Sequence, residues 1–381
     1  MTTMKRTIPL ARPDLTEREV EAVVRVLRTP RLSLGPVLKA FERKLAEVAG
    51  VKHAVAVNSG TSALHLCVKA LGIEEGDEVI TTPFSFIASA NCILFERAKP
   101  VFVDIDPDTL NLDPELVETA ITKRTRAILA VDVFGHPAEW DALTHIAKEH
   151  GLKLIEDAAE ALGAAYKGRP AGSFGDAAVF AFYPNKQITT GEGGAVLTGE
   201  DEIVKLCRSL RNQGRGEGST AGWLQHERLG YNYRLSDVNC ALGLAQLERL
   251  DELLAQREHV AQLYNERLEP LERRGLLRRP HVAPHVRMSW FVYVVRLEDR
   301  FTRRERDLVL EKLRAQGVEC ADYFPPIHLQ PVYRALGYKP RDFPVAEAVA
   351  QRTLALPFHT RLTPDDVDYV VKQLEAALDS L

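Results

Sequence analysis

The residues His53-Ala54-Val55-Ala56-Val57 are the first of a series of short apolar runs that decides the fold. Six further runs follow: EVITT at 78–82, PVFVDI at 100–105, RAILAVDVF at 126–134, LKLIED at 152–157, AAVFAF at 177–182 and GAVLT at 194–198. A segment long enough for one helix separates each of the first five runs from the next. Short buried strands that alternate with helices are typical of βαβ units. We therefore predict an α/β fold with a doubly wound, mostly parallel sheet of seven strands.

Two helices are predicted before the first strand. Thr16 and Glu19 form a T-x-x-E capping box, and apolar residues at helical spacing follow over 20–27. A second helical pattern over 41–48 ends at Gly50.

The pattern changes beyond the last predicted strand. A Gly-rich polar stretch at 213–222 predicts a mobile, functional loop, and apolar positions over 236–268 predict one long helix. We predict a large α/β domain over 1–250 with an N-terminal helical segment. A smaller C-terminal α+β domain is predicted over 251–381, joined to the first by the long helix.

Composition limits the classes of partner. The chain of 381 residues has 49 Lys and Arg against 53 Asp and Glu, a net charge of -4, so we expect no nucleic-acid partner. No stretch approaches the roughly 18 apolar residues of a membrane span, and we expect no membrane partner. The five cysteines form no C-x-x-C pair, which favours a reducing cytoplasm, and no residue spacing indicates a metal site.

The residues 58–64, NSGTSAL, stand where the first predicted strand gives way to a helix. Free backbone N–H groups, the positive end of the helix dipole and two hydroxyl groups would hold a phosphate there. Simple helix capping is the alternative interpretation.

Two acids, Glu156 and Asp157, end a strand that we expect to be central and buried. In doubly wound sheets ligands bind at that end of the strands, and an acid placed there could pair with a protonated ring nitrogen. Capping of the next helix is the alternative.

Lys186 lies in FAFYPNKQITTGEGG at 180–194, between two predicted strands. Desolvation among aromatic and small residues would lower the pKa of the lysine and favour the nucleophilic amine. A lone lysine is usually a solvated charge. With a phosphate turn and a strand-end acid upstream, however, the three fixtures that pyridoxal phosphate needs are present in one chain.

Six motifs in this order resemble the sugar-nucleotide aminotransferase family of the fold-type I pyridoxal phosphate enzymes. They are GTSALHL at 60, GDEVITTPFSFIASAN at 76, VFVDIDPDTLNLD at 101, IEDAAEALGA at 155, FYPNKQITTGEGG at 182 and LGYNYRLSDVNCALGLAQL at 229. The chain is most similar to the perosamine-synthase-like 4-aminotransferases.

The resemblance implies roles for individual residues. Lys186 corresponds to the lysine that binds the cofactor aldehyde and moves the proton during transfer, and Asp157 to the partner of the pyridine nitrogen. Gly60, Thr61 and Ser62 resemble the phosphate cradle.

Four further residues take cofactor roles from the same resemblance. Phe86 stands where an aromatic ring stacks on the cofactor. Asn232 matches an asparagine that reaches the phosphate from the neighbouring subunit, with Arg234 close by, which implies a homodimer with shared active sites. Glu160 could face the cofactor, or it could be a solvated helix charge.

Two segments depart from the family pattern: residues 132–135, DVFG, where many relatives read H-x-Y-G or H-x-F-G, and the phosphate site. Many relatives carry a serine five residues before the lysine, where this chain has Ala181. Asn185, Thr189 or Thr190 could supply the missing phosphate contact.

Substrate contacts are implied in two places. His328 aligns with a family histidine near the sugar, and its alternative role is a hydrogen-bonding or surface residue. Arg31 and Ser33 resemble an N-terminal loop near the substrate, and a plain turn is the alternative.

The resemblance implies transfer of an amino group from L-glutamate to a nucleotide-linked keto-deoxysugar, with a 4-keto-6-deoxysugar as the expected acceptor. Such sugars serve cell-surface polysaccharides or secondary metabolites. Three alternatives remain: a sugar dehydrase, in which histidine replaces the lysine; a cysteine desulfurase, which needs a loop cysteine; and a regulatory or binding homologue without catalysis.

Overall fold

The structure, a computed structural model, describes residues 6–216 and 225–381. Residues 217–224, which belong largely to the loop predicted at 213–222, lie outside the described residues. All seven predicted strands are present in one sheet of order β1-β9-β8-β5-β4-β2-β3. Their bounds are β1 His53–Val57, β2 Glu78–Thr81, β3 Lys99–Phe102, β4 Thr125–Val131, β5 Lys153–Asp157, β8 Ala177–Ala181 and β9 Gly194–Thr198. All run parallel except β9, which is antiparallel to β1 and β8, so the predicted mostly parallel sheet is confirmed.

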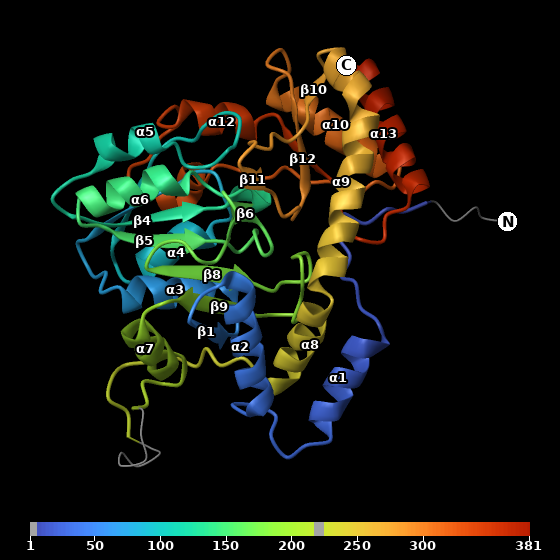
Figure 1. Ribbon diagram of the computed structural model, residues 1–381. Coiled ribbons are helices and arrows are strands. Elements are labelled where there is room, and N and C mark those ends of the chain that lie inside the picture. Colours follow the sequence, from blue (N-terminus) through green and yellow to red (C-terminus); the bar gives the residue numbers. More distant parts are fainter. Residues whose placement is uncertain (1–5, 217–224) are drawn as a thin grey trace.

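Helices cover both faces of this sheet (Figure 1). Along β1, Val55 and Val57 pack in the cluster that includes α3, whereas Ala54 and Ala56 pack in the cluster that includes α2. The helices of the N-terminal two thirds are α1 Glu17–Leu27, α2 Pro36–Ala49, α3 Gly60–Ala70, α4 Ala88–Phe95, α5 Pro114–Val117, α6 Trp140–Glu149, α7 Asp201–Arg211 and α8 Asp237–Glu248. Burial on both faces explains why the strands are continuous apolar runs rather than alternating ones.

A smaller antiparallel sheet, β10-β12-β13, lies in the C-terminal part. Its strands are Leu277–Arg278, Tyr293–Leu297 and Thr353–Leu356, and the helices beside it are α9 Leu250–Arg273, α10 Arg303–Ala315, α11 Pro331–Arg334, α12 Pro344–Ala350 and α13 Pro364–Asp379. In Figure 1, α9 runs along one side of the molecule with α13 beside it. A third sheet joins distant segments, because β11 (Val286–Arg287) pairs with β6 (Ala165–Tyr166), which also pairs with β7 (Arg169–Pro170). The domain limits at 250 and 251 remain a prediction.

The single helix predicted over 236–268 is wrong. The chain forms α8 and α9 there, with non-helical backbone at Arg249 between them. The buried Arg249 guanidinium donates to the carboxylates of Glu19 and Asp14, so the break occurs where this side chain turns toward the N-terminal segment.

Helix α1 begins after Thr16 with the predicted capping box. Its apolar stripe does not face the core, however, because Val20 and Leu27 are 49% and 56% exposed. The buried positions are Glu19, Ala22 and Val26, which face α8. Glu19 accepts hydrogen bonds from Gln246 and Arg249, and these bonds account for the orientation of the helix.

The five cysteines are all buried and unpaired. Within the two described ranges, no helix combines the length and apolarity needed to cross a membrane.

Gly135 provides a test of how the C-terminal part docks on the sheet. Its φ is +91°, its carbonyl accepts the Ser289 N–H at 3.0 Å, and an added Cβ would lie 1.8 Å from the Ser289 carbonyl oxygen. Gly135→Ala should therefore lose about 1–3 kcal/mol of unfolding free energy through backbone strain and about 1–3 kcal/mol through overpacking. Urea unfolding measures the loss.

Gly151→Ala is the matched control, because Gly151 also has a positive φ, +64°, but nothing lies within 4 Å of an added Cβ. Equal losses in the two variants would show that the contact with Ser289 adds nothing.

Candidate active site

A cavity of about 740 Å³ opens at the carboxyl ends of the parallel strands. The segments that follow β1, β2, β5 and β8 line it, together with the last residue of β4, Phe291 and residues 322–325 of the C-terminal part. Ligands of doubly wound sheets bind in this position, and the volume suits a small molecule.

Lys186 projects into the cavity from the loop between β8 and β9. Its Nζ lies 3.6 Å from Oε1 of Glu160 and 3.9 Å from the centroid of the Phe291 ring. Burial lowers the pKa of the Lys186 ammonium, and the nearby carboxylates of Glu160 and Asp157 oppose that shift. A larger share of this lysine is therefore the free, nucleophilic amine than of a solvated lysine.

Asp157, the last residue of β5, lines the same cavity and is 3% exposed. The Ser89 hydroxyl donates to Oδ2 at 2.8 Å, and the Ala159 N–H donates to Oδ1 at 3.2 Å. Burial raises the pKa of Asp157, although both hydrogen bonds oppose the shift. Because both donors are neutral, a cation in the cavity would offset the cost of burying this carboxylate.

Glu160 is a buried cavity residue, not a solvated helix charge. One carboxylate oxygen faces Lys186, and the other accepts the Phe134 N–H at 2.9 Å. Burial raises the pKa of Glu160, and the charge of Lys186 opposes the rise. The carboxylate therefore fixes the lysine against the loop after β4.

The start of α3 forms another wall of the cavity. Ser59 caps the helix by accepting the Ser62 N–H, and its hydroxyl also donates to the Ser62 hydroxyl at 2.9 Å. Gly60 and Thr61 line the cavity, whereas Ser62 does not. An added Cβ at Gly60 would lie 2.7 Å from Cβ of Ala181, so the helix approaches β8 closely and leaves its first N–H groups open to an anion.

Of the three residues considered as substitutes for a serine at 181, only Asn185 lines the cavity. Among the described residues, its buried Oδ1 is one of the side-chain oxygens without a hydrogen-bond donor. The hydroxyls of Thr189 and Thr190 donate to the carbonyl oxygens of Phe182 and Glu192.

Phe86 also lines the cavity and is 60% exposed. The structure thus brings together seven predicted residues: Gly60, Thr61, Phe86, Asp157, Glu160, Asn185 and Lys186.

Asn232 and Arg234 do not line this cavity. Asn232 is exposed, and Arg234 Nη1 donates to Oδ1 of Asn212 at 2.9 Å. Arg31 and Ser33 are also exposed, and Ser33 pairs with Ser236 in an isolated bridge. The two predicted segments, 31–33 and 232–234, therefore lie close together on one surface.

His328 lies away from the cavity as well. It is fully buried, its Nε2 is 3.0 Å from Oε1 of Glu347, and its ring packs against Phe343. This placement agrees with the hydrogen-bonding alternative for His328.

The cavity residues that escaped the sequence reasoning include Ser89, Phe291 and Tyr323. Ser89 lies within the PFSFIASAN segment, three residues after Phe86, and this helical spacing could have indicated that both residues face the cavity. Phe291 and Tyr323 come from the C-terminal part, and only the tertiary structure brings them to the sheet.

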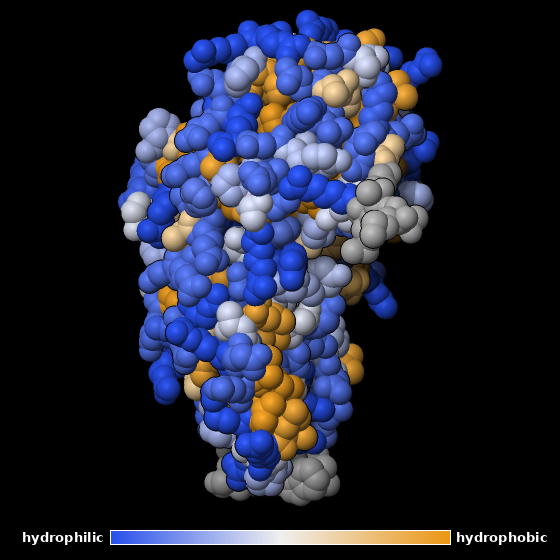
Figure 2. Space-filling model, turned by 90° about the vertical axis from the view of Figure 1, so that its right-hand side faces the viewer, coloured by the Kyte–Doolittle hydropathy of each residue, from blue (hydrophilic) through white to orange (hydrophobic). Residues whose placement is uncertain are grey.

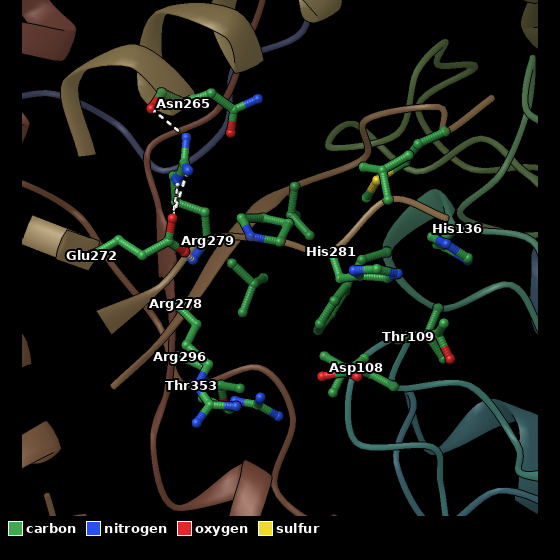
Figure 3. Close-up of a pocket in the computed structure, with 18 residues that line it drawn as sticks. Asp108, Thr109, His136, Asn265, Glu272, Arg278, Arg279, His281, Arg296 and Thr353 are labelled. Atoms are coloured by element: carbon green, nitrogen blue, oxygen red, sulfur yellow. Dashed lines mark hydrogen bonds and ion pairs between the residues drawn. The ribbon is translucent and has the colours of Figure 1, made fainter. Parts of the chain in front are cut away.

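A second cavity, of about 430 Å³, lies between residues 108–110 and 133–136 on one side and the C-terminal part on the other. Two of its arginines already bind groups of the protein. Arg279 donates to the Glu272 carboxylate and to the Asn265 carbonyl (Figure 3), and Arg278 forms an ion pair with Glu298. The first cavity, with its nucleophile and buried acids, is therefore the better candidate for catalysis.

On the surface, Glu118, Glu149 and His150 place one ligand atom each within 4.8 Å of one another, which the sequence spacing did not indicate. All three are exposed, and exposed groups of this kind are common without a metal ion.

Comparisons with known proteins agree with this geometry. The profile of the DegT/DnrJ/EryC1/StrS aminotransferase family matches residues 13–375. GDP-perosamine synthase of Caulobacter vibrioides is 42% identical over 372 residues, which cover 97% of this chain and 98% of that protein. The solved structure of DesV from S. venezuelae has 38% identity and a TM-score of 0.87, covering 95% of this chain and 94% of that one. The putative sugar aminotransferase Spr1654 of Streptococcus pneumoniae, in its PLP-form, has 29% identity and a TM-score of 0.93, covering 98% and 99%.

The lowered pKa of Lys186 predicts its reactivity in the protein freed of cofactor. Acylation needs the unprotonated amine, so the pH midpoint for labelling Lys186 should lie below that of an exposed lysine such as Lys372. Competitive labelling with acetic anhydride at a series of pH values, read by peptide mass spectrometry, measures both residues in one sample. A midpoint for Lys186 at or above that of Lys372 would contradict the expectation.

Proposed function

We propose a specific transamination for this chain, which belongs to the DegT/DnrJ/EryC1/StrS aminotransferase family. Like its relatives, the chain is a pyridoxal phosphate-dependent sugar aminotransferase. The proposed amino donor is L-glutamate, which leaves as 2-oxoglutarate. The proposed acceptor is a nucleotide-linked 4-keto-6-deoxysugar. Relatives named GDP-perosamine synthase, at 42% and 36% identity, support a nucleotide-linked acceptor.

The observation that carries the proposal is the arrangement of three groups around one cavity. The open N–H groups at the start of α3 would hold the phosphate, Asp157 would pair with the ring nitrogen, and Lys186 would bind the aldehyde. The buried Asp157 favours such a ligand, because a protonated ring nitrogen supplies the missing cation. The unpaired Asn185 oxygen beside the cavity is a further polar group for the ligand or the substrate.

When bound, pyridoxal phosphate supplies an aldehyde that carries amino groups and a ring that accepts electrons. The protein must then hold and move a proton at the carbon that gains or loses nitrogen. We assign this task to Lys186 Nζ, because its lowered pKa makes the amine a competent base. Glu160 and Phe291 hold the lysine when it is free.

We also propose that two copies of the chain form a homodimer with shared active sites. Exposed apolar side chains of α1 and the following loop, Val20, Leu27, Leu32 and Leu34, support a contact surface. Figure 2 shows the face that lies on the right-hand side of Figure 1, and an apolar strip runs along its lower part, where α1 lies. Asp237 N donates to the Leu32 carbonyl, so this surface continues into the segment with Asn232 and Arg234. Those two residues would then face the cavity of the partner.

The alternatives differ at identifiable residues. A dehydrase of this family carries histidine where this chain has Lys186, and the loop 213–222 contains no cysteine for a desulfurase. A cytoplasmic location remains a prediction from the cysteine content.

The reaction is tested by absorbance of the purified protein with pyridoxal phosphate. We expect visible absorbance that L-glutamate removes and that one member of a panel of nucleotide-linked 4-keto-6-deoxysugars restores. Lys186→Ala should lose turnover by at least about 10³-fold, because the same group binds the aldehyde and moves the proton.

A nucleotide-linked sugar without a ketone is the control and should restore nothing. Absorbance that glutamate leaves unchanged would favour a regulatory homologue, and a deoxygenated product without added nitrogen would favour a dehydrase.

The dimer is tested by light scattering on Leu27→Glu. A buried charge at a contact surface opposes association, so we expect a shift toward the monomer. Leu116→Glu is the matched control, because Leu116 is also an exposed leucine, at 40%, but lies on α5. A dimer of undiminished stability in Leu27→Glu would show that the α1 strip is not the interface.

A further inference from the structure

Arg257, on α9, is a buried cation whose hydrogen bonds go to the main chain. Only 4% of the residue is exposed. Among the described residues, no acid lies within ion-pair distance of its guanidinium, in contrast to the buried Arg249 and Arg211, which pair with glutamates. Burial lowers the pKa of Arg257 to about 10. Such a group is expensive to bury, and it requires compensation from its surroundings.

The compensation comes from carbonyl groups on both sides of the active site. Arg257 Nη2 donates to the Lys186 carbonyl at 2.9 Å, and Nη1 donates to the carbonyls of Trp290 and Phe291 at 3.2 Å each. The ring of Phe358 lies 5.7 Å from the guanidinium carbon. One planar fork therefore holds the backbones of two segments that are distant in sequence.

The side chains of those two segments meet in the cavity. Lys186 Nζ lies over the Phe291 ring, so the distance between the ammonium and its aromatic contact depends on both backbones. A cation over an aromatic face is attracted only within about 6 Å of the centroid. A shift between the segments would move the amine relative to Glu160 as well.

We propose that Arg257 is a positioning residue for Lys186. It joins the loop between β8 and β9, which carries Lys186 and is here called the lysine loop, to the segment that contains Trp290 and Phe291, and so fixes where the free amine lies. The inference rests on the proposed role of Lys186 as the group that binds the aldehyde and moves the proton. The charge of Arg257 also lowers the pKa of Lys186, which favours the free amine. The same guanidinium thus acts on the position and on the protonation of the lysine.

The test compares Arg257→Met and Arg257→Lys with Arg306→Met. Arg306 is also buried and donates to the carbonyls of Ala350 and Thr353. Its nearest link to the cavity is an ion pair of 3.7 Å with Asp322. Competitive acetylation of Lys186 in the full chain freed of cofactor measures its pH midpoint, and steady-state kinetics of the loaded enzyme measure kcat and KM for the sugar.

Arg257→Met should raise the midpoint, because a nearby positive charge is lost, and labelling at neutral pH should slow by about threefold. Its kcat should fall by at least about 10-fold with little change in KM, since a misplaced amine affects the chemical step. Arg257→Lys keeps the positive charge but lacks the planar guanidinium that bonds to both segments. It should therefore retain the pH midpoint for labelling Lys186 and still lose kcat. Arg306→Met should lose thermal stability without moving the midpoint.

A purely structural role would give another result. Arg257 variants that lose stability as Arg306→Met does, but keep both the Lys186 midpoint and kcat, would overturn the proposal. If Arg257→Met does not fold, kcat of Arg257→Lys decides the question. If transamination itself fails in the unmodified enzyme, the midpoint in Arg257→Met still decides whether the arginine acts on Lys186.

Discussion

The carboxylate of Asp157 is the constraint on which the arrangement of the active site depends. A charge buried at the end of a central parallel strand is unfavourable unless hydrogen bonds and a nearby cation compensate for it. The Ser89 hydroxyl and the Ala159 N–H supply the hydrogen bonds, and the cavity leaves room for the cation. The strand ends, the start of α3 and the lysine loop therefore converge on one point, where a ligand with a positive ring nitrogen and a negative phosphate meets groups of the opposite charge.

A second network closes the site from the C-terminal side. Gln187, next to the lysine, donates to the carbonyls of Glu160 and Ser289 and to the Ser289 hydroxyl. The Ser289 N–H in turn donates to the Gly135 carbonyl, while the Phe134 N–H donates to Glu160. Hydrogen bonds of the Gln187, Glu160 and Ser289 side chains and of main-chain groups thus link the loop after β4, the loop that carries Lys186 and the segment before β12. The position of Lys186 depends on all three segments.

Local signals predicted much of this structure. The seven apolar runs, identified by their length and spacing, correspond to the seven strands of the sheet. The motifs around Gly60, Asp157 and Lys186 lie at one cavity, because parallel strands end at the same edge of a sheet. Features that depend on long-range partners could not be predicted. The helix break at Arg249 reflects Asp14 and Glu19 of the N-terminal segment, and the stripe of α1 faces outward because Glu19 is held by α8. Arg257 bonds to carbonyl groups that carry no side-chain signature.

The antiparallel direction of β9 has a consequence for the reactive loop. Since β8 and β9 are neighbours in the sheet, the chain that carries Lys186 is a hairpin connection anchored at both ends by the same ladder, rather than part of a long crossover. A loop whose two ends are held together by this ladder has less conformational entropy to lose or regain than a connection with free ends. The loop can therefore keep its shape each time the lysine releases one chemical partner and takes another, and the cost of reordering the backbone is not added to every cycle.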